Sequence, residues 1–214
     1  MKNHFQSEID KFISLYPNFS TRDISASNKA LRGNIDIVDV KGDLWGTYEI
    51  DIIVPREHYP YVTPFVFEIS AKVERTEDWH ISDTGLCCLD ITHNLILLEK
   101  RGLNLISFYQ EKIYPFFANH TYRIHTGRYA NGDYPHEFEG VKSFYKNDLG
   151  LKDTGFTISL LDCIVNRKLP ERNSLCLCGK DKYKKCHMPI VERLLSFGYP
   201  QLTDDLRQFR DEMI

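Results

Sequence analysis

Apolar residues near the start of the chain recur at helical spacing. The members of this pattern are Phe5, Ile9, Phe12, Ile13 and Tyr16. Residues three or four positions apart share one face of a helix, and the Pro17 that follows is typical of the end of a helix. The pattern therefore predicts a helix over 3–16. The next stretch, 18–28, is polar and predicts a loop.

The pattern then changes to the alternation of apolar and polar residues that half-buried strands show. The apolar residues of three successive runs are Ile35, Ile37 and Val40, then Tyr48, Ile50, Ile52 and Ile53, then Phe65, Phe67 and Ile69. Gly42 and Asp43 mark a turn between the first two runs. Because a short link joins strands that run in opposite directions, the sequence predicts an antiparallel meander.

The remaining pattern predicts loops and further helices. Two prolines and two tyrosines in 58–64 indicate a fixed loop, since proline does not pair inside a sheet. The stretch 70–83 is polar and is expected to be irregular. A second amphipathic helix is predicted over 103–117 and a long ordered loop over 119–139. The later helix predictions are 141–145, 158–166, 190–197 and a short last helix over 203–210, capped by Thr203 or Asp204.

Composition narrows the class of protein. The chain has 214 residues, enough for one domain or for one domain and a small appendage. With 42% hydrophobic and 27% charged residues it is expected to fold rather than to stay disordered. No apolar run approaches the roughly 18 residues of a membrane-spanning helix, and no secretory signal is recognised, so a cytoplasmic protein without membrane contact is expected. The net charge of −3 argues against general nucleic-acid affinity.

Cysteine is the residue type that first suggests chemistry. The chain has six cysteines, two of them adjacent and three clustered near the end. Disulfides are not expected in a reducing compartment, so metal binding or thiol chemistry is the better interpretation.

Cys88 is the first candidate for such chemistry. A cysteine among small and apolar residues is usually buried in the core. Here Gly85 permits a turn before it and Asp90 follows it, so the thiol can instead lie exposed at the end of an irregular segment. Neighbouring side chains of an extended segment point to opposite sides. One thiol of the pair Cys87 and Cys88 is therefore expected to face solvent and the other the core.

Three motifs, in their order and spacing, resemble the core of the ubiquitin-conjugating (UBC-like) family of the bacterial type. They are Tyr59-Pro60-Tyr61-Val62-Thr63-Pro64, then His80, then Gly85-Leu86-Cys87-Cys88-Leu89-Asp90-Ile91. The family carries a tyrosine–proline loop, a His-Pro-Asn element and a Gly-x-hydrophobic-Cys-Leu-Asp-hydrophobic segment. The resemblance covers roughly 3–118. It implies an α/β (α+β) fold in which a four-strand antiparallel meander is flanked by helices.

The resemblance also implies roles for single residues. Cys88 becomes the exposed thioester-forming cysteine, and Cys87 becomes a core residue or a second thiol. His80 is either a base or a structural residue of its loop. Asp90 either steers or deprotonates an acceptor lysine, or it caps a turn. The stretch 131–140 resembles a loop of bacterial UBC-like proteins from antiviral operons, in which His136 is either a base beside Cys88 or an exposed loop histidine.

One part of the family pattern is broken. Trp79-His80-Ile81-Ser82 keeps the histidine but lacks the asparagine that donates to the oxyanion in the family. Ser82, Asn94 or backbone N–H groups would have to replace that donor. The alternatives are slow aminolysis or an inactive relative.

The second candidate site is a metal site near the end of the chain. Cys176, Cys178, Cys186 and His187 place four ligands within twelve residues. Three thiolates and one imidazole suit a closed tetrahedral structural zinc site. The stretch 171–190 resembles the SEC-C motif, a small zinc module of bacterial proteins, so structural Zn²⁺ is the expected cofactor. The stretch 171–187 contains five basic and two acidic residues. This local positive charge indicates either a docking surface for a protein partner or a solvated lysine face.

These observations predict two parts, a UBC-like conjugating domain over 1–150 and a helical extension with the zinc motif over 151–214. The resemblance implies an enzyme that carries a ubiquitin-like protein as a thioester on Cys88 and transfers it to an amine of a target protein, in an anti-phage or ubiquitin-like operon. No glycine-rich phosphate loop is present, so a separate ATP-dependent activating enzyme is expected. The alternatives are a non-catalytic UBC-like adaptor and, third, a cysteine hydrolase that pairs Cys88 with His136.

Overall fold

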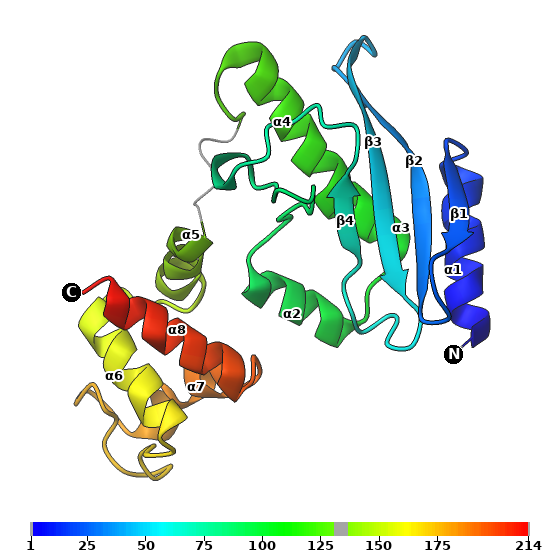
Figure 1. Ribbon diagram of the computed structural model, residues 1–214. Coiled ribbons are helices and arrows are strands. Elements are labelled where there is room, and N and C mark those ends of the chain that lie inside the picture. Colours follow the sequence, from blue (N-terminus) through cyan, green and yellow to red (C-terminus); the bar gives the residue numbers. More distant parts are fainter. Residues whose placement is uncertain (1, 131–136, 214) are drawn as a thin grey trace. The chain divides into compact units, whose positions relative to one another are not determined.

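The computed structural model describes residues 2–130 and 137–213 of the chain (Figure 1). Two compact units divide the chain, Met1–His136 and Glu137–Ile214. The division lies at 136/137 and not at the predicted 150/151. The reason is that helix α5 (Glu137–Ser143) and the π-helix η3 (Phe144–Asp148) belong with the second unit, where the Phe144 ring packs edge-on against Phe197.

The first unit contains a four-stranded antiparallel sheet in the order β1-β2-β3-β4. The strands are β1 (Phe19–Asp23), β2 (Asn28–Val38), β3 (Leu44–Pro55) and β4 (Phe65–Glu68). Each strand pairs with the next along the chain, so the antiparallel meander and the mixed α+β class are confirmed.

Strand β1 occupies a stretch that the sequence pattern predicts as a loop, and that prediction is wrong. Phe19 is the buried residue of this strand and the other four residues are exposed. An edge strand that contributes one side chain to the core has no visible alternation, because most of its residues face water.

Helices cover one face of the sheet (Figure 1). Helix α1 (Lys2–Leu15) agrees with its prediction. Helix α3 (Leu105–Phe108), the π-helix η2 (Tyr109–Ile113) and helix α4 (Tyr114–Thr126) follow one another without a break. The hydrophobic core is made of side chains from both the helices and the sheet. It includes Phe12, Leu31, Ile35, Ile50, Ile52, Leu105, Ile113 and Phe117.

Two features of this helical layer differ from the prediction. Helix α2 (Thr92–Arg101) was not expected, and its side chains are mostly half-buried, so its apolar stripe is weak. Helix α4 extends to Thr126 and α5 begins at Glu137, so the loop predicted over 119–139 is wrong for 119–126 and for 137–139. Asn119, His120 and Thr121 are polar but buried, which is why this part of the helix reads as a loop in the sequence.

The second unit is a small helical body. Besides α5 and η3 it contains α6 (Thr154–Val165), the 3-10 turn η4 (Tyr183–Lys185), α7 (Met188–Leu195) and α8 (Tyr199–Asp211). Its core includes Phe144, Tyr145, Leu160, Leu161, Ile164, Leu194, Leu202 and Phe209. The hydroxyl of Tyr145 donates to buried Asp205 at 2.6 Å, and Gln201 donates to the other carboxylate oxygen at 2.8 Å.

The last helix begins earlier than its predicted cap. Helix α8 starts at Tyr199, with a proline in its first turn, and the Thr203 hydroxyl donates to the carbonyl of Tyr199 inside the helix. Neither Thr203 nor Asp204 is therefore a cap, because both lie inside the helix and the residue at the cap position is Gly198. Within 2–130 and 137–213, no helix combines the length and apolarity that crossing a bilayer requires.

Candidate functional site

Backbone hydrogen bonds on two sides hold the segment that carries Cys88. The N–H of Cys87 donates to the carbonyl of Val66 in β4 at 2.8 Å, and the N–H of Cys88 donates to the carbonyl of His80 at 2.8 Å. Short antiparallel bridges accompany these bonds, one of them between Ile81 and Cys87. The position of the Cys88 backbone is thus set by β4 and by the loop before it.

The two adjacent thiols face opposite ways, as the sequence predicts. Cys88 is exposed, and Cys87 lies in the hydrophobic core with 7% of its surface exposed. Burial raises the pKa of Cys87 to about 12, so at neutral pH this residue is a thiol and not a thiolate. The nucleophilic candidate of the pair is therefore Cys88, whose Sγ lies 3.9 Å from the carbonyl oxygen of Asp90.

Gly85 makes the turn before this segment possible. Its φ of +88° lies in the left-handed region, and a Cβ at this position would lie 2.4 Å from both the Arg75 guanidinium and the Glu68 carbonyl. The close approach of Gly85 leaves room for the bonds between Arg75 and Glu68. Arg75 donates to the Glu68 carbonyl at 2.9 Å and lies 3.4 Å from the Glu68 carboxylate. Fully buried Glu68 also accepts from the N–H of Ala71 at 3.0 Å. Glycine is required because any side chain would displace this network.

His80 positions Cys88 through its backbone. It ends the 3-10 turn η1 (Glu77–Trp79) in a left-handed conformation, with φ of +51°. Its N–H donates to the Glu77 carbonyl at 2.9 Å, while its own carbonyl accepts from Cys88. This backbone arrangement gives His80 a structural part in its loop, while a role of its side chain as a base stays a prediction.

Asp90 holds together the elements behind Cys88. Its carboxylate accepts from the N–H of Ile91 and from the Asn94 side chain, each at 2.8 Å, and pairs with Lys112 of η2 at 2.6 Å. These three bonds hold the Asp90 carboxylate within the chain, and its proposed part in steering or deprotonating an acceptor lysine stays a prediction. Asn94 and Ser82, the possible oxyanion donors, also form hydrogen bonds: Asn94 donates to Asp90, and the Ser82 oxygen accepts from the N–H of Leu86 at 3.1 Å and lies 2.9 Å from the Thr84 hydroxyl. His136 lies outside the described residues.

Two residues of α4 that the sequence did not single out clamp the loop before Cys88. Arg123 donates to the Asp78 carbonyl at 2.7 Å and pairs with its carboxylate, and the guanidinium lies 4.0 Å from the centre of the Trp79 ring. His120, one helical turn earlier, lies with Nε2 2.7 Å from the Trp79 carbonyl. The spacing of three along a helix was the available signal, but it does not indicate which loop the two side chains meet.

His120 gives this clamp a dependence on pH. Its second ring nitrogen, Nδ1, lies 2.7 Å from the Phe116 carbonyl, and the residue is fully buried. Burial lowers the pKa of His120 below its usual value of 6.5, although the two carbonyl oxygens act in the opposite direction. The folded protein therefore takes up this proton at lower pH than the unfolded chain does.

We expect the first unit to lose stability as the pH falls below about 6.5, where the unfolded chain begins to bind a proton that folded His120 resists. Above that pH the contribution is fully present, and it is lost as the pH passes through the folded-state pKa. In His120→Gln this component disappears, and about 1–3 kcal/mol of stability is lost at every pH with the hydrogen bond that the neutral imidazole donates. Urea unfolding between pH 7.5 and 5.5 measures both effects.

Tryptophan fluorescence is a suitable probe, because Trp45 and Trp79 both belong to the first unit and Trp79 packs against His120. His58→Gln, the same change at an exposed position of the first unit, is the matched control and should keep the wild-type pH dependence. If the free energy of unfolding varied with pH in the same way in wild type and in His120→Gln, the pH dependence could not be assigned to His120.

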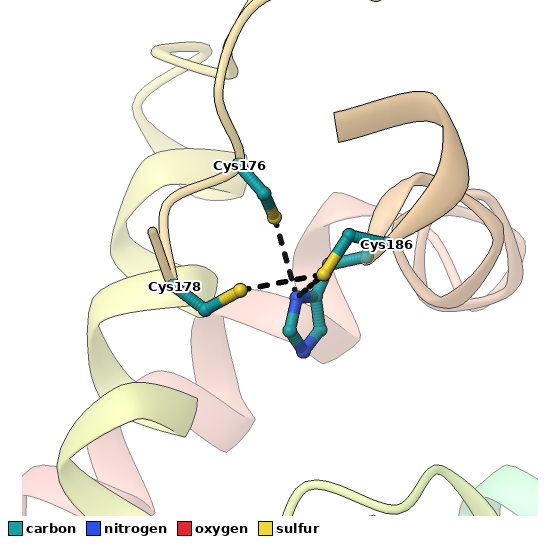
Figure 2. A group of neighbouring side chains, drawn as sticks. Cys176, Cys178 and Cys186 are labelled. Carbon is teal, nitrogen blue, oxygen red and sulfur yellow. Dashed lines mark hydrogen bonds between the residues drawn. The ribbon is translucent and has the colours of Figure 1, made fainter. Parts of the chain in front are cut away.

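The predicted metal ligands form a cluster in the second unit (Figure 2). Their four ligand atoms all lie within 4.8 Å of one another. Cys178 and Cys186 have sulfurs 3.3 Å apart, and Nδ1 of His187 lies 3.3 Å from the sulfur of Cys176 and 3.2 Å from that of Cys186. A tetrahedral ion with bonds of about 2.0–2.3 Å keeps its ligand atoms roughly 3.3–3.8 Å apart. The cluster is therefore close to the size that such an ion needs.

Local structure explains why the ligands converge. A reverse turn follows Cys176, because the N–H of Gly179 donates back to its carbonyl at 2.8 Å and Gly179 has φ of +73°. The turn η4 precedes Cys186, and His187 is the cap residue immediately before α7. Every ligand thus lies on a turn or at a helix start, where backbone direction changes.

Electrostatics also favour a cation in this cluster. A backbone N–H from Lys180 lowers the pKa of Cys178, whereas the hydrogen bond with Cys178 raises the pKa of Cys186 to about 12. A second thiolate is unfavourable here because negative charge already lies beside it. A bound metal ion would remove that repulsion, and the donor set of three sulfurs and one imidazole fits it.

Neither a scan against protein-family models nor searches among curated proteins and solved structures found a match for this chain. The UBC-like and SEC-C resemblances therefore rest on the motifs of this sequence.

Proposed function

We propose that the chain is a bacterial UBC-like conjugating protein that carries a ubiquitin-like modifier as a thioester on Cys88. The observation that carries the proposal is the pair of adjacent cysteines, of which Cys88 is exposed and Cys87 is buried. A thiol fixed by backbone bonds at the surface, after Gly85 and before Leu-Asp, suits the position of the family's catalytic cysteine. The proposal includes a role in an anti-phage or ubiquitin-like operon.

The reaction divides one acyl transfer into two steps. In the first, the Cys88 sulfur attacks the thioester carbonyl of the modifier held by a separate ATP-dependent activating enzyme. A carbon–sulfur bond to Cys88 forms, the bond to the activating enzyme's sulfur breaks, and the proton of Cys88 passes to the leaving thiolate. In the second step a target amine attacks the thioester carbonyl and a carbon–nitrogen bond forms. The carbon–sulfur bond to Cys88 breaks, and the amine proton passes to the leaving Cys88 sulfur directly or through solvent.

The residues around Cys88 position it in this proposal. His80 holds the Cys88 N–H, and Asp90 links the start of α2 to Lys112. The candidate replacements for the family's missing asparagine all form hydrogen bonds within the chain: Ser82 bonds to Leu86, Asn94 to Asp90, and the N–H of Cys88 to His80.

The cluster of Cys176, Cys178, Cys186 and His187 is proposed to bind structural Zn²⁺ in a SEC-C-like module. With four protein ligands it leaves no open position for a substrate, so its role is to stabilise a segment with a small core. The exposed basic residues of the module, Arg172, Lys180, Lys182 and Lys185, are proposed to recruit a protein partner.

Incubation of the full-length protein with its activating enzyme, the modifier and ATP tests the proposal. We expect a new band on a non-reducing gel at the summed mass of the chain and the modifier, and its loss after treatment with a thiol. An adduct that survives the thiol would contradict a thioester, and absence of an adduct would leave the second candidate function.

The second candidate is a non-catalytic adaptor that binds the modifier and recruits a partner through the metal module. The broken His-Pro-Asn element favours it, and so does Asp90, whose carboxylate is held by three donors. An adaptor would bind the modifier in a pull-down experiment without forming a covalent band.

A further inference from the structure

The edge of β2 is open over its second half. Strand β1 pairs with β2 from Lys29 to Gly33, and among the described residues no strand continues beside Asn34–Val38 on that side. An edge without a neighbour presents a row of N–H and C=O groups with which another chain can pair.

The direction of these groups follows from the register. Backbone groups of successive residues in an antiparallel strand alternate between the two sides. The Asn28 carbonyl accepts from the N–H of Ile24 on the β1 side at 3.2 Å, and the N–H of Val38 points to a tyrosine hydroxyl 3.5 Å away, at the open edge. Asn34 and Asp36 fall in the same alternation. Their N–H and C=O groups therefore point toward the open edge.

A cleft of about 430 Å³ lies beside this edge, a size typical of binding clefts. Tyr16, Tyr109 and Tyr114 line it, and the Tyr114 hydroxyl is the one that faces the Val38 N–H. Asp36 is the one charged residue among the described residues that line the cleft. The Asp36 carboxylate accepts from the Thr47 hydroxyl of β3, so it lies on the exposed face of the sheet, next to the cleft and its aromatic rings.

We propose that this edge binds an extended segment of a partner protein that carries a basic side chain. The segment would add a short strand beside Asn34–Val38, because main-chain hydrogen bonds supply affinity in this mode of recognition. Its apolar side chains would face the tyrosine-lined cleft, and its basic side chain, on the opposite face of the added strand, would lie beside Asp36, whose carboxylate attracts a cation. This surface does not involve Cys88, so the inference is independent of the proposed function.

Peptide binding to the full-length protein tests the inference. The probes are two fluorescein-labelled five-residue peptides, one alternating valine and lysine and one alternating valine and glutamate. We expect the fluorescence anisotropy of the lysine peptide to rise with protein and that of the glutamate peptide to stay unchanged. Asp36→Lys should weaken binding by about tenfold or more, equal to about 1.4 kcal/mol. Asp43→Lys, the same charge change on the β2–β3 turn outside the cleft, should bind as wild type.

A second measurement tests the strand pairing itself. Asn34→Pro removes one N–H that faces the open edge and leaves the pairing with β3 in place. This variant should therefore bind the lysine peptide more weakly than wild type does. Independently of whether that variant folds, amide exchange in the wild type should show protection of Asn34 and Asp36 when the peptide is added.

Three results would overturn the inference. They are equal binding of both peptides, an equal loss of affinity for the lysine peptide in Asp36→Lys and Asp43→Lys, and no added protection of the Asn34 and Asp36 amides from exchange. Protection of these amides with rising protein concentration and no peptide would also overturn it, by showing that a second copy of the chain occupies the edge.

Discussion

Replacement of Cys88 by alanine should abolish the adduct with the modifier, whereas Cys87→Ala should keep it. The two residues are neighbours, so any general disturbance of the segment affects both variants. They differ in exposure: Cys88 is exposed, and Cys87 is buried with a pKa raised to about 12. A thiol that is buried and protonated is a poor nucleophile.

Cys88→Ser should yield an adduct that resists thiol treatment, because an oxygen ester is not exchanged by thiols. Cys87→Ala should lose about 1 kcal/mol of stability through the missing buried sulfur, while retaining the thiol-sensitive band. Non-reducing gels and urea unfolding measure these outcomes. A band that persists in Cys88→Ala would contradict the assignment of the thioester to Cys88. A band that disappears in Cys87→Ala, with folding intact, would contradict it as well.

Removal of the metal ion should selectively unfold the second unit. Binding of a structural ion contributes folding free energy, about 10–16 kcal/mol in small zinc peptides. Loss of even about 3 kcal/mol lowers the Tm of a domain of this size by roughly 12–24 °C. We therefore expect one Zn²⁺ per chain by elemental mass spectrometry, and a large Tm decrease on chelation or in Cys178→Ser.

Cys163→Ser is the matched control for this prediction. Cys163 lies on α6 in the same unit and is not part of the ligand cluster, so its replacement should leave the metal content unchanged. Hydrogen exchange should locate the loss of protection in 137–214, while the fluorescence of Trp45 and Trp79 in the first unit stays constant. A chain that contains no metal, or whose second unit is unaffected by chelation, would contradict a structural ion.

The pattern of apolar and polar residues alone located most helices and strands. It failed where the buried side chains of an element do not recur at helical or strand spacing. Strand β1 was missed because Phe19 is its one buried residue. The end of α4 read as a loop because His120 and Thr121 are polar, although both are buried and hydrogen-bonded in the helix. Polar residues that bond to distant loops reduce the apolar signal of a helix.

Some properties of this protein were determined by the sequence itself. Four metal ligands within twelve residues need only local turns to converge, and two adjacent cysteines of an extended segment must face opposite sides. Both predictions depend on chain connectivity over short distances, which is present in the sequence.

Other properties were decided by the tertiary structure alone. The bond between His120 and Trp79 joins residues 41 positions apart, and that between Tyr114 and Val38 joins residues 76 apart. The boundary between the units, the clamp on the loop before Cys88 and the open edge of β2 all depend on how α4 packs on the sheet or on which helices pack together. Such contacts are set by the simultaneous burial of many side chains, and no local pattern records the partner that each side chain will meet.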